Sequence, residues 1–321
     1  MRPIRLLLLL AACFAAAAQA QTWPAKPVRI VVAYPPGGGI DVMARQIADR
    51  LGSAWGQPVV VENKPGANTI VATDAVAKSA PDGHTVLMTT DATFSINPHL
   101  YAKLPYNAQR DFIPVTMLVL LQQMLVAHPA LPANTLQELI SLARSKPGTI
   151  NYASYGSGSQ PHLSGEMLKN KAGIDLVHVP YKGISLAVPA VMAGEVQLTF
   201  AGIATSTAPL KAGRIKALAI GGSSRSPLYP QVPTFTELGY PDVETHAWFG
   251  LFLPAGSPKE AVSRIYTDVK RILDDPEFRQ KQLIDRGYEV VGSAPDEFVR
   301  YIRRDSESRA RAVKISGAKA E

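Results

Sequence analysis

The sequence predicts an α/β protein built from two lobes. Short runs of β-branched and apolar residues alternate with segments of helical periodicity, a pattern typical of a largely parallel sheet flanked by helices. The alternation occurs once over roughly 28–88 and again over 124–245. No low-complexity linker separates the two stretches, so we expect the chain to cross between lobes through strands near 115–121 and 247–253. Two lobes joined in this way form a hinged clamshell with a ligand cleft between them.

The elements of the first lobe begin with the β-rich run 28–33, which ends at a Tyr-Pro-Pro-Gly-Gly-Gly turn. Apolar residues then recur at Ile40, Met43, Ile47 and Leu51, a spacing that predicts a helix. The remaining elements expected here are a strand at 59–61, a helix at 70–77 and a strand at 86–88.

The second lobe repeats this order, and two charged amphipathic helices follow it at about 258–286 and 295–314. Its expected helices are 135–145, 162–172 and 186–193, and its expected strands are 151–153, 176–179, 196–200 and 215–220.

The length of 321 residues suits two domains that each bury a core. We expect lobe 1 to comprise 21–122 and 247–321, and lobe 2 to comprise 123–246. The formal charge is +7, but the basic residues are spread along the chain, which argues against a nucleic-acid partner.

Residues 1–20 have the features of a secretory signal peptide. A basic segment, a short apolar run and Ala18-Gln19-Ala20 predict export with cleavage after Ala20. The alternative, less favoured because apolar residues follow, is lipoprotein processing at Cys13. Cleavage after Ala20 removes the chain's one cysteine, which excludes Cys-nucleophile and metal-thiolate chemistry.

Two glycine-rich loops precede expected helices, one at 37–39 and one at 156–159. Glycine lets the backbone approach a ligand closely, and amides at a helix N-terminus attract anions, so both loops are candidate carboxylate sites. A purely structural turn is the alternative for the first loop. For the second, Ser159 and His162 could serve in nucleophilic catalysis, although a G-x-S-x-G elbow and an orienting acid are missing.

The other candidate residues are better explained by structural or solvent-exposed roles than by chemistry. The six histidines lack metal-ligand spacing, so we expect no metal and no cofactor. Lys182 is better interpreted as a solvated or anion-contacting lysine than as a Schiff base, and the C-terminal arginines as a solvated helix face.

Collinear motifs along nearly the whole chain after the signal peptide carry a resemblance to a known family. The segment Tyr34-Pro-Pro-Gly-Gly-Gly-Ile-Asp-Val-Met-Ala-Arg45 resembles the first loop and helix of the Bug family, the TctC-like periplasmic receptors of tripartite tricarboxylate transporters. Further matching motifs lie at 61–66, 79–83, 97–101, 104–106, 111–115, 151–154, 156–159, 162–163, 178–183 and 232–234.

The resemblance implies a two-lobe Venus-flytrap periplasmic binding protein without catalysis, holding a carboxylate in its cleft. Matching motifs imply lobe 1 contacts from Tyr34, Pro35, Gly37, Gly38, Asp41, Thr90 and Asp91. They imply lobe 2 contacts from Ser157, Gly158, Ser159 and His162, with Tyr181 and Gly183 nearby.

Two loops that face the expected cleft depart from the family pattern. Asp91 and Phe94-Ser95 stand where a small hydroxyl residue and His-Ala are frequent, and 200–202 reads Phe-Ala-Gly instead of Phe-Asp-Asn. These departures leave open whether a second carboxylate is bound there. His84 replaces a frequent aromatic and affects packing only.

The expected function is a monomeric periplasmic receptor for a small organic acid, such as a dicarboxylate or aromatic carboxylate. Hinge closure would capture the acid, and the closed receptor would present it to the membrane permease of a tripartite tricarboxylate transporter. The alternatives are a secreted Ser/His hydrolase and a ligand-sensing adaptor for a membrane sensor kinase.

Overall fold

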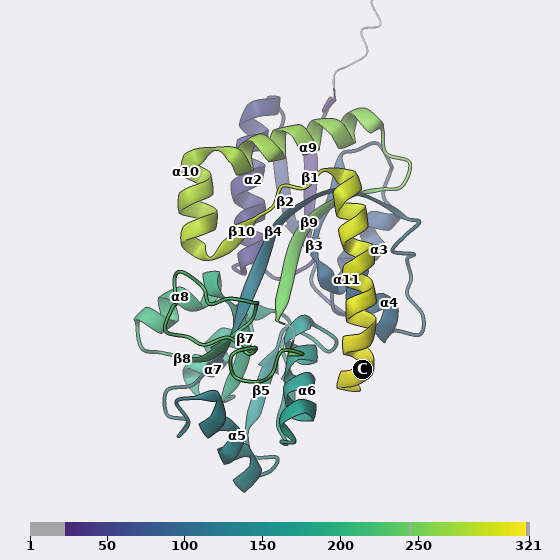
Figure 1. The fold of residues 1–321 in the computed structure, drawn as a ribbon. Helices are drawn as coiled ribbons and strands as arrows, with labels where there is room; N and C mark the ends of the chain where they lie inside the picture. Colours follow the sequence, from purple (N-terminus) through teal and green to yellow (C-terminus); the bar gives the residue numbers. More distant parts are fainter. Residues whose placement is uncertain (1–22, 244, 319–321) are drawn as a thin grey trace, which may run out of the picture.

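The computed structural model describes residues 23–243 and 245–318, so the expected signal peptide, its cleavage site and Cys13 lie outside the described residues. Figure 1 shows a sheet that runs the length of the molecule, with helices packed along it. It has ten strands in the order β2-β1-β3-β9-β4-β7-β5-β6, and β8 and β10 also pair with β4.

The first part of the sheet contains the elements expected for lobe 1. They are β1 (Val28–Val32), α2 (Gly39–Trp55), β2 (Val59–Asn63), α3 (Ile70–Ala77) and β3 (Thr85–Thr90). β1 pairs in parallel with both β2 and β3, as the strand–helix alternation predicts. A π-helical turn, η1 (Ala92–Ile96), and the short α4 (Asn97–Leu100) follow β3 and were not expected from the sequence.

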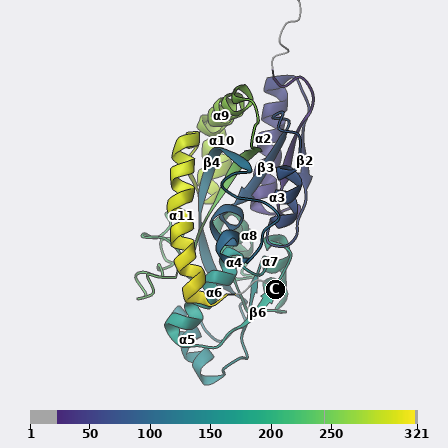
Figure 2. The same cartoon turned by 90° about the vertical axis from the view of Figure 1, so that its right-hand side faces the viewer.

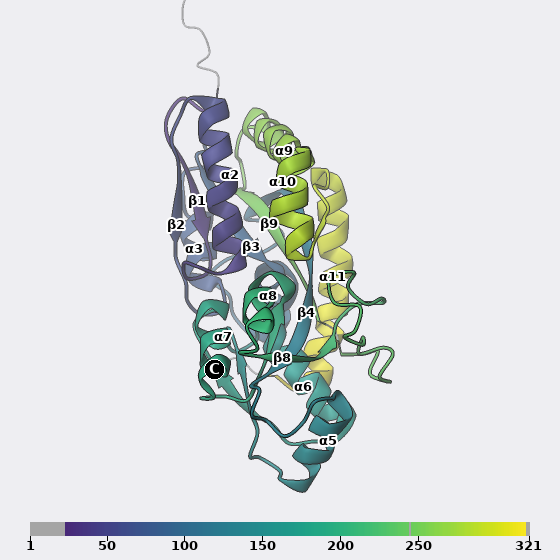
Figure 3. The same cartoon turned by 90° about the vertical axis from the view of Figure 1, so that its left-hand side faces the viewer.

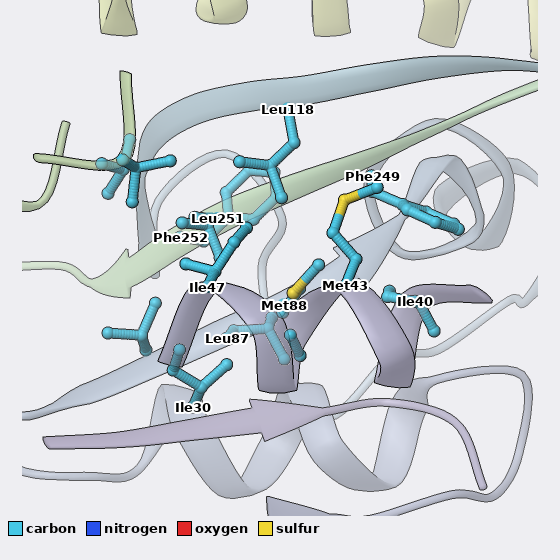
Figure 4. Packing of buried hydrophobic residues seen from close by; sticks show 14 of the residues in the cluster. Ile30, Ile40, Met43, Ile47, Leu87, Met88, Leu118, Phe249, Leu251 and Phe252 are labelled. Atoms are coloured by element: carbon cyan, nitrogen blue, oxygen red, sulfur yellow. The ribbon is translucent and has the colours of Figure 1, made fainter. Parts of the chain in front are cut away.

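The apolar residues that recur with helical periodicity in α2 form one face of the helix, and this face covers the first part of the sheet. Ile40, Met43 and Ile47 are almost fully buried. Figure 4 shows the side chain of Met43 extending toward Phe249 and that of Ile47 lying near Leu251, both on a neighbouring strand. This packing fixes the N-terminal end of α2 relative to the sheet.

One long strand, β4 (Phe112–Ala127), connects the two parts of the sheet. Up to Gln122 it pairs with β9 (His246–Pro254), and from Gln123 onward it pairs with β7. All pairings of β4 and β9 are antiparallel. The expectation of a mostly parallel sheet in each lobe is therefore correct for the flanking strands and wrong for this centre. The chain leaves the first part of the sheet along β4 and returns along β9, so these two strands run in opposite directions.

The second part of the sheet contains the elements expected for lobe 2, in the expected order. They are α5 (Leu136–Ser145), β5 (Asn151–Ser154), α6 (Gln160–Ala172), β6 (Val177–Pro180), α7 (Ile184–Ala193), β7 (Leu198–Gly202), α8 (Ile203–Lys211) and β8 (Lys216–Ile220). β5 pairs in parallel with β6 and β7. Two separate apolar clusters fill this part, distinct from the core of the first part.

The helix expected over 258–286 is interrupted. α9 (Lys259–Asp274) ends where Asp275 caps a new turn by accepting the N–H of Phe278, and Pro276 begins that turn. The chain continues as α10 (Pro276–Phe278), η2 (Arg279–Leu283), η3 (Ile284–Arg286) and β10 (Tyr288–Val290). Proline cannot donate the hydrogen bond that a continuous helix needs at this point.

The last helix, α11 (Pro295–Ser316), spans both parts of the sheet. Figure 2 shows it running from beside α9 down to α6. Phe298 belongs to the core of the first part, whereas Ala312 belongs to a cluster of the second part. α11 therefore braces the two parts against each other.

Candidate functional site

A pocket lies where the two parts of the sheet meet. The space between its walls that no atom fills is about 600 Å³, and this figure includes open solvent at the mouth. Both parts contribute to it, and its lining includes Tyr34, Gly38, Thr90, Gln123, Ser185 and Thr205. None of the described residues that line it carries a charged side chain.

Three helices direct their N-terminal ends at this central pocket. The first residues of α2, α7 and α8 line it, and Figure 3 shows one end of α2 close to α7 and α8. The residue before each helix is a glycine, namely Gly38, Gly183 and Gly202, and no side chain caps any of the three helices. Uncapped helix N-termini carry free N–H groups and partial positive charge, so together they attract an anion.

The inner wall of the central pocket consists of neutral hydroxyl groups. The hydroxyls of Tyr34 and Thr90 lie 3.0 Å apart, and the Tyr34 ring meets Tyr155 edge to face. Burial is the main cause that raises the pKa of both tyrosines above the usual value, so both phenols are neutral at neutral pH. Tyr34 and Tyr155 belong to different parts of the sheet, and their contact closes the inner end.

Gln123 also lines this pocket, although it belongs to none of the motifs that predicted site residues. Its Nε2 donates to the Tyr155 hydroxyl over 3.1 Å. The signal that could have found it is a pair of glutamines, Gln122-Gln123, inside the otherwise apolar run 117–127. Buried polar groups in a strand core need partners, which makes such a pair a candidate for function.

Asp41, which the resemblance places among the ligand contacts, is buried beneath the first glycine loop and does not line the central pocket. Its carboxylate accepts hydrogen bonds from the Gly37 N–H, the Arg45 guanidinium and the Asn63 amide. Burial alone would raise the pKa of this carboxyl, but these donors outweigh it and hold the pKa below its usual value. Asp41 therefore holds the loop in shape.

Replacing Asp41 with alanine is expected to lower the free energy of unfolding by about 1–3 kcal/mol, because several donors lose a charged acceptor. The glycine loop would lose its anchor at Gly37, so carboxylate affinity should also fall. Urea unfolding and calorimetric titration measure the two effects. Asp49→Ala on the exposed face of the same helix is the matched control, and equal behaviour of the two variants would contradict the anchoring role.

Asp91 is also absent from the lining of the central pocket. It is 1% exposed and lies 3.5 Å from Arg309 of α11. Arg309 in turn contacts Asp305 at 3.3 Å and donates to the His246 carbonyl at 2.7 Å. Burial raises the pKa of Asp91 to about 7, against the opposing effect of Arg309. This buried cluster joins α11 to the end of β3.

The second glycine loop borders a separate, neighbouring pocket. Ser157 and Tyr181 line it, together with Asn68 and the other face of Tyr34 and Tyr155. Residues 67–69 adopt the left-handed conformation although none is a glycine, and two hydrogen bonds between Asn68 and Asn97 help to hold them there. Tyr34 and Tyr155 line both pockets, and their contact separates them. Of the expected site residues, Pro35, Gly38 and Thr90 line the central pocket, whereas Ser157 and Tyr181 line the neighbouring one.

Gly158 and Ser159 lie immediately before α6, and His162 lies in its first turn. The Gly158 N–H donates to His162 Nδ1 at 2.9 Å, and the His162 ring stacks on His178 at 3.9 Å. Burial, aided by Lys169, lowers the pKa of His162 to about 4, so the ring is neutral. Ser159 Oγ has no hydrogen-bond partner, so the structure contains no Ser159–His162 pair.

The remaining expected contacts lie at the meeting of the two parts. Gly183 is so close to Pro35 that a Cβ on it would stand 2.8 Å from the proline ring. Pro35 lines the central pocket, and Gly37 lines its outer extension, where Arg286 is also found.

The described residues form neither a metal-binding cluster nor a membrane-spanning helix. Between residues 23 and 318, excluding 244, no three histidine, cysteine or acidic side chains are placed to hold one metal ion. Within the same residues, no helix is both long and apolar enough to cross a bilayer.

Comparison with family models matches residues 43–317 to the tripartite tricarboxylate transporter family receptor. Among curated proteins, BugT of Bordetella pertussis is 34% identical over 310 residues, which covers 95% of this chain and 94% of BugT.

Solved structures of periplasmic binding proteins are also similar to this chain. The R. palustris protein Rpa4515 with adipate superimposes with a TM-score of 0.89 at 32% identity, covering 92% of this chain and 99% of that one. MatC from Rhodopseudomonas palustris with bound malate gives a TM-score of 0.86 at 32% identity, with coverage of 91% and 100%. The periplasmic binding protein BugD gives 0.88 at 30% identity, with coverage of 93% and 100%.

Proposed function

Because this chain belongs to the tripartite tricarboxylate transporter receptor family, we propose that it captures a small organic acid between two lobes and delivers it to a membrane transporter of that type. The chain is a periplasmic solute-binding protein with an α/β binding-protein fold, and its family consists of binding proteins rather than enzymes. Two structural relatives hold adipate and malate, which supports an organic acid as the ligand here.

The observation that carries the proposal is the meeting of three uncapped helix N-termini at one uncharged pocket. A carboxylate placed there would accept hydrogen bonds from amides of α2, α7 and α8. Bonds to a charged acceptor contribute about 1.5–3 kcal/mol each, so a few of them suffice for tight binding. No titratable partner is needed, because a carboxylate is already ionised at neutral pH.

We propose that lobe 1 comprises 21–122 with 247–321 and that lobe 2 comprises 123–246. The pairing of β4 supports this boundary, since its partner changes from β9 to β7 between Gln122 and Gln123. α2 would then belong to lobe 1, and α7 and α8 to lobe 2. A ligand that contacts all three helices would favour the closed arrangement over an open one.

The partner of the closed receptor would be the permease of a tripartite transporter, and a sensor kinase is the alternative partner. We further propose a monomer that is exported and cleaved after Ala20, with Pro35, Gly38 and Thr90 as lobe 1 contacts. Ser157 and Tyr181 would act from the neighbouring pocket, which they line.

The test is calorimetric titration and thermal unfolding of protein that has been unfolded and refolded to remove any carried ligand. A panel of mono-, di- and tricarboxylates and neutral analogues is added. We expect saturable stabilisation by at least one acid, about 2.7 kcal/mol at 100 times its dissociation constant. Stabilisation by the methyl ester equal to that by the free acid would contradict an anion site.

The hydrolase alternative makes a different prediction. It requires turnover of the bound compound and loss of that turnover in Ser159→Ala, whereas a receptor returns its ligand unchanged. The neutral ring of His162 accepts from Gly158 instead of activating Ser159, which argues for the receptor. Mass spectrometry of the incubated ligand distinguishes the two.

A further inference from the structure

We propose that the inner end of the central pocket binds a hydroxyl group, so that the ligand is a hydroxylated monocarboxylate with an apolar body rather than a dicarboxylate. This inference rests on the proposed function, since it takes the pocket to hold an organic acid.

The first observation is an unused acceptor on Gln123. This side chain is 3% exposed and lines the central pocket. Its Nε2 donates to the Tyr155 hydroxyl, and its Oε1 has no hydrogen-bond partner. A buried carbonyl oxygen without a donor is unfavourable, and nearly all such atoms in folded proteins have one. A donor group on the ligand would supply the missing hydrogen bond.

The second observation is a donor beside that acceptor. Because the Tyr155 hydroxyl oxygen accepts the bond from Gln123, its own proton remains to be donated. The inner end therefore offers one donor, the Tyr155 hydroxyl, and one acceptor, Gln123 Oε1. The Tyr155 hydroxyl oxygen lies 3.1 Å from Gln123 Nε2. A ligand hydroxyl can accept from Tyr155 and donate to Gln123 Oε1 at once. An ionised carboxylate can only accept hydrogen bonds. Its oxygens would therefore form no hydrogen bond with Gln123 Oε1 and would be repelled by that oxygen.

The third observation is the charge distribution along the pocket. None of the residues that line the central pocket is cationic. Behind the inner end, besides the larger effect of burial, Asp91 raises the pKa of Tyr155 and Arg309 lowers it, and these two charged groups are paired with each other. A second carboxylate would be desolvated there without a counter-charge, which is costly. The cation Arg286 lies at the outer extension, which shares Gly39 and the α7 and α8 starts with the central pocket. The anionic end of the ligand therefore points outward and its neutral end inward.

The wall between these ends is apolar. Leu121, Ala247 and Phe249 line it from β4 and β9, and Ile184 lines it from α7. Such a wall suits a ring or a short alkyl chain, because burying apolar surface is favourable at about 25 cal/mol per Å².

The test compares ligands that differ only at the end opposite the carboxylate. We would titrate refolded protein with 4-hydroxybenzoate, 4-methylbenzoate and terephthalate, and with 6-hydroxyhexanoate, heptanoate and adipate. We expect the hydroxyl compound of at least one set to bind ten times or more tighter than its methyl and carboxylate counterparts. A dicarboxylate that binds tighter than its hydroxyl counterpart would overturn the inference while leaving the proposed function intact.

The variant Gln123→Leu tests the assigned acceptor. It should lower the affinity for the hydroxyl compound at least tenfold and leave the affinity for the methyl compound unchanged or higher. Gln122→Leu is the matched control, because Gln122 faces a different pocket and donates to the Ser224 carbonyl. Retention of the hydroxyl preference in Gln123→Leu would overturn the assignment. Binding by none of these acids and no other carboxylate would overturn the proposed function itself.

Discussion

Replacing Gly38 with valine is expected to weaken carboxylate binding at least 100-fold while the protein stays folded. Gly38 lines the central pocket and precedes the uncapped start of α2. A Cβ there would stand 3.4 Å from the Ile184 side chain, which is a tight but tolerable contact. The two further methyl groups of valine would occupy the space in which a carboxylate approaches the amides. A 100-fold loss corresponds to about 2.7 kcal/mol of binding free energy.

The backbone at Gly38 makes this variant a clean test of the loop. Its φ of −77° and ψ of 165° lie in the extended region, which valine adopts readily, so we expect a cooperative unfolding transition close to that of the parent. Gly38→Ala should give an intermediate loss. Ala54→Val, on the exposed face of the same helix, controls for a β-branched residue in α2. Near-parental affinity in Gly38→Val would remove this loop from the site.

Replacing Arg309 with methionine is expected to lower the free energy of unfolding by about 3–5 kcal/mol at pH 8. Arg309 is 3% exposed and lies between Asp91 and Asp305, so its loss leaves buried carboxylates without their cation. The loss should be smaller at pH 5. The pKa of Asp91 is about 7, so at pH 5 this carboxyl is already protonated in the folded protein and needs no counter-charge.

Asp91 also affects how the stability of the parent protein depends on pH. A carboxyl pKa raised by folding means that the folded state binds more protons than the unfolded state between about pH 4 and 7, so this group makes stability fall as pH rises. His162, whose pKa is lowered to about 4, acts in the opposite direction. Comparing Arg309→Met with its parent at each pH cancels the histidine effect.

Denaturant unfolding at pH 5 and pH 8 measures the effect, and Arg311→Met, an exposed arginine of the same helix, is the control. A pH-independent loss in Arg309→Met would show that Asp91 is not the group left uncompensated. Asp91→Asn combined with Arg309→Met should restore part of the stability at pH 8.

Local patterns in the sequence determined much of the fold. Helical spacing at Ile40, Met43 and Ile47 predicted α2, and the glycine loop at 37–39 marked one of the three helix N-termini at the central pocket. The second predicted loop, at 156–159, precedes α6 and borders the neighbouring pocket. These features depend on residues near one another in the chain, so periodicity and turn chemistry reveal them. The collinear motifs also identified the family correctly.

Other features depend on residues far apart in the chain, and only the tertiary structure decided them. Asp41 was expected to contact the ligand; in the structure it lies outside the lining of the central pocket, and its carboxylate accepts hydrogen bonds from Gly37 and Asn63. Arg309 was expected on a solvated helix face, yet α11 buries it against Asp91. Gln123 belongs to no motif, and it borders the pocket only because β4 crosses between the two parts of the sheet. Burial and charge at each of these positions are set by long-range packing, which local sequence patterns do not encode.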